Sequence, residues 1–401
     1  MYGVRNERVS DVLRIEDGLK RPYLDFYRSL DISPVHQDIS DLARHYRRRE
    51  SLYRFLGIPR SAVRGADVIE FGPGSGLNAL YTASLRPASY TLVDANGRGI
   101  ADMRALFAQH DVVEGIAIVE SLVEELPVTS SYDLVLAEGL IVIQTDPAAF
   151  AQRIAQFAKP GGIVVLTCSD AVSVFAEAGR RLIAGRVAPA DMDLDRRMSI
   201  LRSLFTPHLT TLAAMSRPID DWILDNIIQP FGDGKLFSMS DAIEGLEADF
   251  DVYGSSPRFL TDWRWYKEVA NVERGFNELA RRNYGESVLN LLDHRFVHER
   301  QPAAFGQALL AHCQVFYELM LQLETGSDVW REINVCLVEI ADVVLPVAPE
   351  TCESIQSLRE FLFAARPDTC QLEAFAPFFG RGLQYMSFVR RAEDGDTCLV
   401  H

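Results

Sequence analysis

Between residues 66 and 168 the chain alternates between short apolar segments and helix-length amphipathic ones. The apolar segments are rich in β-branched residues and almost continuously apolar, as strands buried on both faces are. Because strands that alternate with helices form parallel sheets, this region is predicted to be a doubly wound α/β domain. The predicted strands read ADVIEF, SYTLVDA, GIAIVES, SYDLVLAEG and GGIVVLTC.

The rest of the chain is mostly helical. Helices are predicted within residues 20–57 and in long blocks at 171–247 and 262–376. Two late strand-like segments, 248–259 and 382–390, are most simply placed in the same sheet. We therefore predict a Rossmann-like, doubly wound, mostly parallel seven-stranded sheet with an N-terminal helical cap and large helical insertions, without an independent second domain. The predicted divisions are 1–60 for the cap, 61–170 for the Rossmann-like core, 171–247 for the first insertion, and 248–401 for the late strands with the second insertion.

The composition narrows the range of partners. With 56 acidic and 40 basic side chains among 401 residues, the formal net charge is −16. Nucleic acid and anionic membrane surfaces require clustered Lys and Arg, so we expect a small-molecule partner instead. No run approaches the roughly 18 apolar residues of a membrane span, and no secretory leader is visible. The six cysteines show neither disulfide nor zinc spacing, which predicts reduced thiols in the cytoplasm.

The strongest local signal is a glycine-rich turn, VIEFGPGSG, at residues 68–76. Gly72, Gly74 and Gly76 follow a predicted buried strand and precede a helix, where glycine permits a tight turn and close approach to a nucleotide. The second strand ends at Asp94, and an acid there is placed to accept hydrogen bonds from both hydroxyls of a ribose. The alternative, a plain βαβ turn with a solvated Asp, is disfavoured by this combination of signals.

Five motifs in this order resemble the class I S-adenosylmethionine-dependent methyltransferases. They are E-x-G-x-G-x-G, VDA, EELP, YDLVLAEG and KPGGIVVL, and they cover about residues 60–170. A dinucleotide oxidoreductase would carry G-x-G-x-x-G, from which this turn departs. The resemblance implies S-adenosylmethionine as cofactor and methyl donor.

The resemblance also implies a role for each matched residue. The three glycines would line the methionine portion of S-adenosylmethionine, and Glu70 would engage its amino acid end through backbone or water. Asp94 would hold the ribose, and Ala95 would lie beside the adenine.

The segment after the third predicted strand departs from the family pattern. Many relatives place an Asp there to bind the adenine amino group, whereas this chain has Leu122. The adenine contacts are therefore expected from Ser121, Leu122 and Val123, through the Ser121 hydroxyl or a backbone carbonyl.

Methyl transfer from a sulfonium requires alignment, exclusion of water, and a base only where the nucleophile is protonated. Glu138 follows the fourth predicted strand, where relatives place groups that face the reacting methyl. It is a candidate to orient an amine, accept a proton or bind the cofactor's ammonium group, and a loop salt bridge is the equal alternative. Glu138 and Tyr46 are the candidate catalytic residues.

Aromatic residues precede the glycine-rich turn, where this superfamily often places a helical lid. In one interpretation their rings shield the sulfonium while Tyr46 or Arg49 binds the cofactor carboxylate. In the other, two amphipathic helices pack these rings on the sheet. The rings are those of Tyr23, Phe26, Tyr27, Tyr46 and Tyr53.

Two later segments carry weaker signals. Residues 258–269 concentrate Trp, Tyr, Arg and Lys, which suits either an acceptor pocket or buried anchoring of the inserted helices. His294 and His298 are four residues apart and share a face if the segment is helical. No third ligand with suitable spacing is visible, so no metal is assigned.

Three functions are compatible with these patterns. The first is in-line methyl transfer from S-adenosylmethionine to a small-molecule acceptor, in secondary metabolism or cell-surface sugar modification. The second is cyclisation of S-adenosylmethionine to azetidine-2-carboxylate with release of methylthioadenosine, as in a few members of this fold. The third is a non-catalytic, cofactor-binding scaffold. The sequence predicts neither the acceptor nor the oligomeric state.

Overall fold

The computed structural model describes residues 22–32, 37–112, 114–213, 215–230, 236–269, 275–367 and 369–392. These residues form two compact units. The sheet unit comprises the described parts of residues 31–169, 235–284 and 383–401, and the helical unit those of residues 1–30, 170–234 and 285–382. The divisions expected at residues 60, 170 and 247 stay a prediction.

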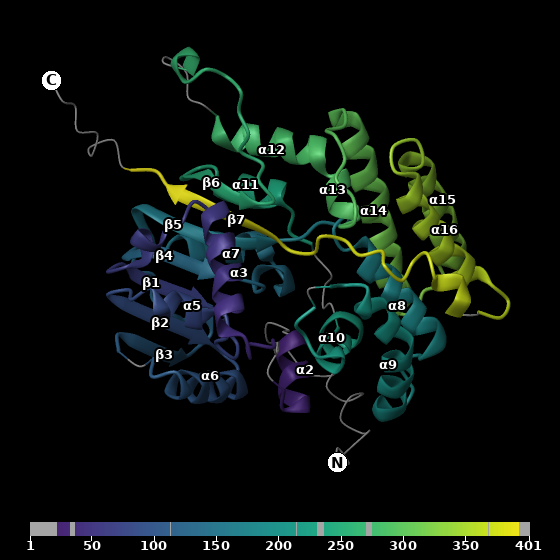
Figure 1. The fold of residues 1–401 in the computed structure, drawn as a ribbon, viewed down its shortest axis with the longest axis horizontal. Coiled ribbons are helices and arrows are strands. Elements are labelled where there is room, and N and C mark those ends of the chain that lie inside the picture. Colours follow the sequence, from purple (N-terminus) through teal and green to yellow (C-terminus); the bar gives the residue numbers. More distant parts are fainter. Residues whose placement is uncertain are drawn as a thin grey trace. The chain divides into compact units, whose positions relative to one another are not determined.

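The sheet unit is built on seven strands in the order β3-β2-β1-β4-β5-β7-β6 (Figure 1). The first five strands pair in parallel, whereas β7 runs antiparallel to both β5 and β6. Both late strands therefore join the same sheet, and the predicted Rossmann-like fold is confirmed. The strands are β1 (Asp67–Phe71), β2 (Ser89–Asp94), β3 (Ile116–Glu120), β4 (Tyr132–Ala137), β5 (Ala158–Cys168), β6 (Phe250–Ser256) and β7 (Gln384–Arg390).

The strand register determines which residues meet at the edge of the sheet. The last four residues of β1 and of β4 are buried, which explains why these residues are apolar apart from Glu70. Phe71, the last residue of β1, pairs with Val93 on β2 and with Ala137 on β4. The residues that follow these three parallel strands therefore meet at one carboxyl-terminal edge.

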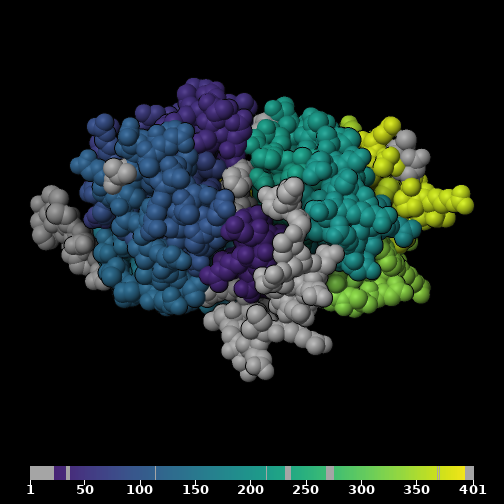
Figure 2. Space-filling model, turned by 90° about the horizontal axis from the view of Figure 1, so that it is seen from below, coloured from purple at the N-terminus to yellow at the C-terminus, as the bar shows by residue number. Residues whose placement is uncertain are grey.

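Helices flank the sheet and begin at residues that favour helix starts. Asp41, Asn96 and Asp146 each accept a hydrogen bond from a backbone amide in the first turn of the following helix. Figure 2 shows the purple segment that contains α3 and α4 packed on the blue segments of the same unit. The helices are α3 (Leu42–Phe55), α4 (Arg60–Val63), α5 (Ala79–Ser84), α6 (Gly97–Gln109), α7 (Pro147–Ala155) and α11 (Met239–Leu246), and short turns lie at η1 (Val123–Glu125), η2 (Ile141–Ile143) and η4 (Tyr266–Val269).

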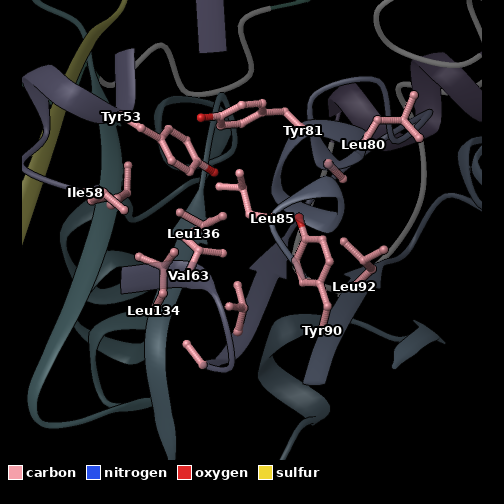
Figure 3. Packing of buried hydrophobic residues seen from close by; sticks show 14 of the residues in the cluster. Tyr53, Ile58, Val63, Leu80, Tyr81, Leu85, Tyr90, Leu92, Leu134 and Leu136 are labelled. Carbon is pink, nitrogen blue, oxygen red and sulfur yellow. The ribbon is translucent and has the colours of Figure 1, made fainter. Parts of the chain in front are cut away.

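The core of the sheet unit lies between α3, α5 and the strands. Tyr53 and Tyr81 point toward one another, with ring centroids 5.2 Å apart in an edge-to-face arrangement (Figure 3). Leu92, Leu134 and Leu136 are buried on the strands beneath them. Burial of each such side chain contributes about 1.5–3 kcal/mol. This packing fixes α3 against the sheet.

The helical unit is built from helix pairs. α14 packs against α15 and α8, and α16 packs against the same two helices. No helix in the described ranges is long and apolar enough to cross a bilayer. The helices are α2 (Pro22–Leu30), α8 (Phe175–Val187), α9 (Leu194–Thr210), α10 (Ile219–Ile223), η3 (Leu224–Ile228), α13 (Leu289–Leu292), α14 (Ala303–Glu324), α15 (Trp330–Val344), α16 (Pro349–Phe363) and η5 (Thr369–Leu372), and α12 (Phe276–Ser287) crosses the boundary at residue 284.

His294 and His298 do not share a helical face, so that expectation is wrong. Helix α13 ends at Leu292, and Asp293 is extended, with φ −138° and ψ 114°. The buried Asp293 carboxylate is held by two side chains, which keep the backbone out of the helix. Among the described residues, no cluster of three metal-binding side chains occurs.

Candidate active site

The glycine-rich turn begins where β1 ends. Gly72, Gly74 and Gly76 have φ angles of +68°, +57° and +79°, a region that glycine adopts freely. A Cβ atom at Gly72 would lie 3.1 Å from the Leu140 side chain, and one at Gly76 would lie 2.6 Å from Met103. The turn is packed closely on two sides, which explains why side chains are missing at these positions.

Asp94 holds this turn from the tip of β2. One carboxylate oxygen accepts from the Gly74 amide at 2.9 Å, and the other accepts from the Asn96 amide at 2.8 Å. Burial raises the pKa of Asp94, and these backbone donors oppose the rise. The Ala95 amide is a third backbone donor to this carboxylate, and since a carboxylate accepts about four hydrogen bonds, capacity for a further one remains. Contacts of Asp94 with a ribose, and of Ala95 with an adenine, stay predictions.

The tip of β3 lies next to Asp94. The Ser121 amide donates to the Asp94 carbonyl at 3.0 Å, and the Ser121 hydroxyl donates to the Leu122 carbonyl at the same distance. Val123 follows as a buried residue. Because the Leu122 side chain has no polar atom, this segment offers hydrogen bonds only through its backbone and Ser121. Its adenine contacts stay predictions.

Glu138 follows β4 directly and pairs with Arg49 of α3. The two Nη atoms of Arg49 donate to the two Glu138 carboxylate oxygens at 2.8 and 2.5 Å. Each side chain is only 7% exposed. Burial opposes the charge on Arg49, but the adjacent carboxylate holds its pKa well above the ordinary value. The sequence left Glu138 either a role at the cofactor or a salt bridge in a loop. The structure shows a salt bridge, and its partner, Arg49, lies on a helix.

Glu70 adds a second buried carboxylate near this pair. It lies on β1 and accepts a hydrogen bond from the hydroxyl of Tyr90 on β2. Burial raises the pKa of Glu70 to about 7, and repulsion by Glu138 adds to the rise. Asp94, Glu70 and Glu138 together outnumber the single cation Arg49 among these residues, which favours a cationic ligand.

Two aromatic residues of α3 pack into the core. The Tyr46 hydroxyl donates to the Leu80 carbonyl at 3.4 Å, and its ring lies 5.7 Å from that of Tyr81. The Tyr53 hydroxyl lies 2.6 Å from the Thr82 hydroxyl. These contacts match the packing interpretation. The catalytic role of Tyr46 stays a prediction.

The aromatic residues of α2 belong to the helical unit instead. The Tyr27 hydroxyl donates to Asp225 at 2.7 Å, and burial raises its pKa. Tyr23 and Phe26 lie on the same helix. The single cap expected from α2 and α3 is therefore divided between the two units.

Three aromatic residues of the segment 258–269 are exposed, so buried anchoring is wrong for them, whereas Phe259 is buried and packs against Tyr284 of α12. Trp263, Trp265 and Tyr266 are 93%, 57% and 66% exposed. The Lys267 ammonium lies 5.1 Å from the Trp265 ring and 5.8 Å from the Tyr266 ring, so these rings find a cation within their own segment. A role in an acceptor pocket stays a prediction.

The pairing of Arg49 with Glu138 is the main feature that sequence reasoning missed. Arg49 ends a run of three arginines, of which it alone is buried. The helical spacing of Arg49 could have revealed its burial. His45, Arg49 and Tyr53 are four residues apart in turn, and they form the buried face of α3.

Comparison with known protein families gives a match over β1 to β5, which include the glycine turn and Asp94. The family model described as a methyltransferase domain matches residues 69–166, about a quarter of the chain. A search of curated proteins gives no match.

Solved structures show only distant similarity. An S-adenosylmethionine-dependent methyltransferase from Mesorhizobium loti is 19% identical over 31% of this chain and 55% of that one, with a TM-score of 0.27. PKMT2 from Rickettsia typhi is 10% identical over 59% and 49%, with a TM-score of 0.40. The cyclase SpnF is 11% identical over 87% and 82%, with a TM-score of 0.36. The chain spans about half the length of the first two, and none of the three supports an argument about activity.

The glycine turn, the acid after β2 and the family match define a nucleotide-binding transferase domain of the Rossmann-like class. Residues 69–166 match the family described as a methyltransferase domain, which agrees with the resemblance that the motifs carry.

Proposed function

We propose that this protein transfers the methyl group of S-adenosylmethionine to a small-molecule acceptor by in-line displacement at the sulfonium. The observation that carries the proposal is the convergence of the glycine turn, Asp94 and Glu138 at one edge of the sheet. The net charge of −16 supports a small acceptor over nucleic acid. The described cysteines 168, 313, 336 and 352 are not in disulfides, in keeping with a cytoplasmic location.

The residues at this edge suit S-adenosylmethionine in hydrogen-bonding capacity and charge. The turn at Gly72 leaves no room for a side chain beside Leu140, so a ligand there meets backbone. The Asp94 carboxylate retains hydrogen-bonding capacity for a ribose. Asp94 and Glu70 supply negative charge for a cation, since Arg49 balances the charge of Glu138. When bound, S-adenosylmethionine supplies an electrophilic methyl group on a good leaving group.

The protein's contribution is positioning rather than covalent chemistry. The strand tips fix the turn and Asp94, which align the donor against an acceptor and supply most of the acceleration. Both Glu138 oxygens accept hydrogen bonds from Arg49, so Glu138 is assigned a binding role rather than that of a free base. An acceptor that must lose a proton would need another base.

Product analysis tests this proposal against its alternatives. The purified full chain is incubated with S-adenosylmethionine alone and with a metabolite extract, and nucleoside products are quantified by mass spectrometry. We expect S-adenosylhomocysteine that depends on the extract and disappears in Asp94→Ala. Methylthioadenosine formed without extract would instead establish cyclisation. Binding of S-adenosylmethionine without either product in any extract fraction would favour a scaffold.

A further inference from the structure

The segment after β6 carries a cluster of exposed aromatic side chains at residues 262–267, which we call the aromatic tip. Trp263 is 93% exposed, and more than half of the surface of Trp265 and of Tyr266 faces solvent. Figure 1 shows the green coil that contains η4 beyond α12, on the side away from the sheet. Clustered exposed aromatic surface of this kind is typical of a contact site.

The base of this segment is anchored in the sheet unit. Phe259 is buried, and its ring packs edge-to-face against Tyr284 of α12, with the centroids 5.8 Å apart. The side-chain amide of Asn283 donates to the carbonyls of Phe259 and Thr261 at 2.6 and 3.1 Å. These contacts hold the chain up to Thr261, and the aromatic tip begins at the next residue. The tip is therefore presented to solvent from a fixed base.

The charges inside the aromatic tip largely cancel. The Asp262 carboxylate accepts from the Arg264 amide at 3.0 Å and from the guanidinium Nε and Nη2 of Arg264 at 3.0 and 2.8 Å. This pair closes the turn and carries no net charge. Lys267 remains as the one cation in excess, with its ammonium 5.1 Å from the Trp265 ring. The tip thus combines three aromatic rings with a single net positive charge.

The size and shape of the aromatic tip distinguish between kinds of partner. A protein interface of standard size takes about 20–30 residues from each side, and the tip is a single short turn. The rings of Trp265 and Tyr266 are inclined at 77°, so they do not form the flat platform on which nucleic-acid bases stack. Trp and Tyr beside basic residues are instead typical of the lipid–water interface, where the ring is buried and its N–H or O–H stays hydrated.

We propose that the aromatic tip is an interfacial anchor that inserts into the headgroup region of a lipid bilayer. Trp263, Trp265 and Tyr266 supply the apolar surface that is buried, and Lys267 reaches the headgroup phosphates from beside the rings. The inference goes beyond the proposed function and does not depend on it, since the tip contributes no residue to the glycine turn or to the charged cluster at the strand tips.

The net charge of the chain determines which force drives this docking. An anionic lipid surface repels a chain of net charge −16, and one excess cation in the tip does not offset that repulsion. Insertion of the rings must therefore supply the binding, and anionic lipid is not required. The charge argues against electrostatic capture by a membrane, and it leaves insertion of aromatic rings open.

Tryptophan fluorescence tests the proposal on the full chain. The protein is titrated with vesicles of phosphatidylcholine and with vesicles of equal parts phosphatidylcholine and phosphatidylserine, and co-sedimentation gives the partition constant. Two of the four tryptophans lie in the tip, whereas Trp222 is already buried. Insertion should therefore shift the emission to shorter wavelength.

Two variants separate the tip from the rest of the surface. The first combines Trp263→Ser, Trp265→Ser and Tyr266→Ser, which removes all three rings. The matched control is Tyr253→Ser, because Tyr253 is 48% exposed on β6, outside the tip. Denaturant titration should give the triple variant the free energy of unfolding of the wild type, which shows that its fold is intact.

The wild type should bind both kinds of vesicle with a blue-shifted emission. Added salt should change its partition constant for phosphatidylcholine by less than about twofold, because the rings and not charges supply the binding. The triple variant should partition about tenfold more weakly or worse, since it loses the apolar surface that the membrane buries. Tyr253→Ser should stay within about twofold of the wild type.

Several results would overturn the inference. They are a wild type that neither shifts its emission nor sediments with either vesicle, and equal partition of the wild type and the triple variant. Binding that requires phosphatidylserine and disappears in salt would assign docking to a basic surface elsewhere. A wild-type dimer that the triple variant does not form, without vesicle binding, would assign the tip to a second copy of the chain. None of these results bears on methyl transfer, which product analysis tests separately.

Discussion

Two buried arginines, one in each unit, show what distinguishes a binding group from a structural one. Arg49 in the sheet unit faces the Glu138 carboxylate. Arg180 of α8 in the helical unit is fully buried and donates to the backbone carbonyls of Ala176, Ala376 and Phe378. The Nε of each lacks a hydrogen-bond partner, so an unpaired N–H by itself does not identify a site.

The surroundings of the two side chains differ in charge. The Arg180 guanidinium carbon lies 3.5 Å from the Phe379 ring centroid, and burial lowers its pKa to about 9. The carboxylate beside Arg49 raises its pKa instead. We interpret Arg180 as a tether that holds the segment before β7 against α8. Arg49, beside a glycine turn and a carboxylate, is placed to contact a ligand.

The largest effect is expected from Arg180→Met. The substitution leaves three carbonyls without their donor, so the free energy of unfolding of the helical unit should fall by about 3–5 kcal/mol. Denaturant titration measures this loss. The control is Arg186→Met on the same helix, which removes one exposed hydrogen bond to the Ala364 carbonyl. It should lower the free energy of unfolding by about 1 kcal/mol or less. Equal stability of Arg180→Met and wild type would contradict the tether.

Acid should destabilise the helical unit through His208. Burial lowers the pKa of His208 to about 3, with the charge of Arg180 adding to the shift. The unfolded chain binds a proton near its ordinary pKa of about 6.5, so the native state loses stability as pH falls from there toward 3. In His208→Phe, the loss of unfolding free energy on acidification should be smaller by a few kcal/mol. The free energy of unfolding of both proteins is measured against pH, and parallel curves for variant and wild type would contradict the role of His208.

The sheet unit should show the opposite pH dependence through Glu70. Its carboxyl has a pKa of about 7 in the folded state and about 4.5 ordinarily, so the native state binds the proton more tightly. Stability is therefore lost as pH rises from about 4.5 to 7, by up to about 3 kcal/mol. Glu70→Gln retains an acceptor for Tyr90 and should flatten this loss. Glu120→Gln, an exposed change on β3, should leave it in place; the same slope in both variants would refute the role of Glu70.

A smaller effect is expected from Gly76→Ala, which tests the glycine turn directly. The residue has φ +79°, and the added Cβ would lie 2.6 Å from Met103, so the variant should lose about 2 kcal/mol of stability and bind S-adenosylhomocysteine more weakly. Gly65→Ala is a matched control, since Gly65 has φ +74° and a Cβ added there would meet no atom within 4 Å. Gly65→Ala should lose only the roughly 1 kcal/mol of stability that a positive φ costs a residue with a Cβ, and its ligand binding should be unchanged.

The fold and the nucleotide-binding turn were predictable because their signals are local. Buried strands have continuous apolar runs, and Gly72, Gly74 and Gly76 mark a turn whose φ angles favour glycine. Asp94 was predictable for the same reason, since it directly follows a recognisable strand.

The charge pairing was not predictable from local patterns. Arg49 and Glu138 are 89 residues apart, and only the packing of α3 on the sheet brings them together. The shared helical face predicted for His294 and His298 was wrong because the helix ends at Leu292, where Asp293 accepts a hydrogen bond from the distant Thr351. The exposure of Trp263, Trp265 and Tyr266 beside the buried Phe259 was not predictable either, because aromatic composition alone does not distinguish burial from exposure.

Calorimetric titration of S-adenosylmethionine into the full chain and into Asp94→Ala tests the central claim most directly. We expect saturable binding to one site in the wild type. The variant should bind about 5–150-fold more weakly, because the ribose loses charge-assisted hydrogen bonds worth about 1–3 kcal/mol. Absence of binding to the wild type at millimolar S-adenosylmethionine, or equal affinity of the two proteins, would contradict the account.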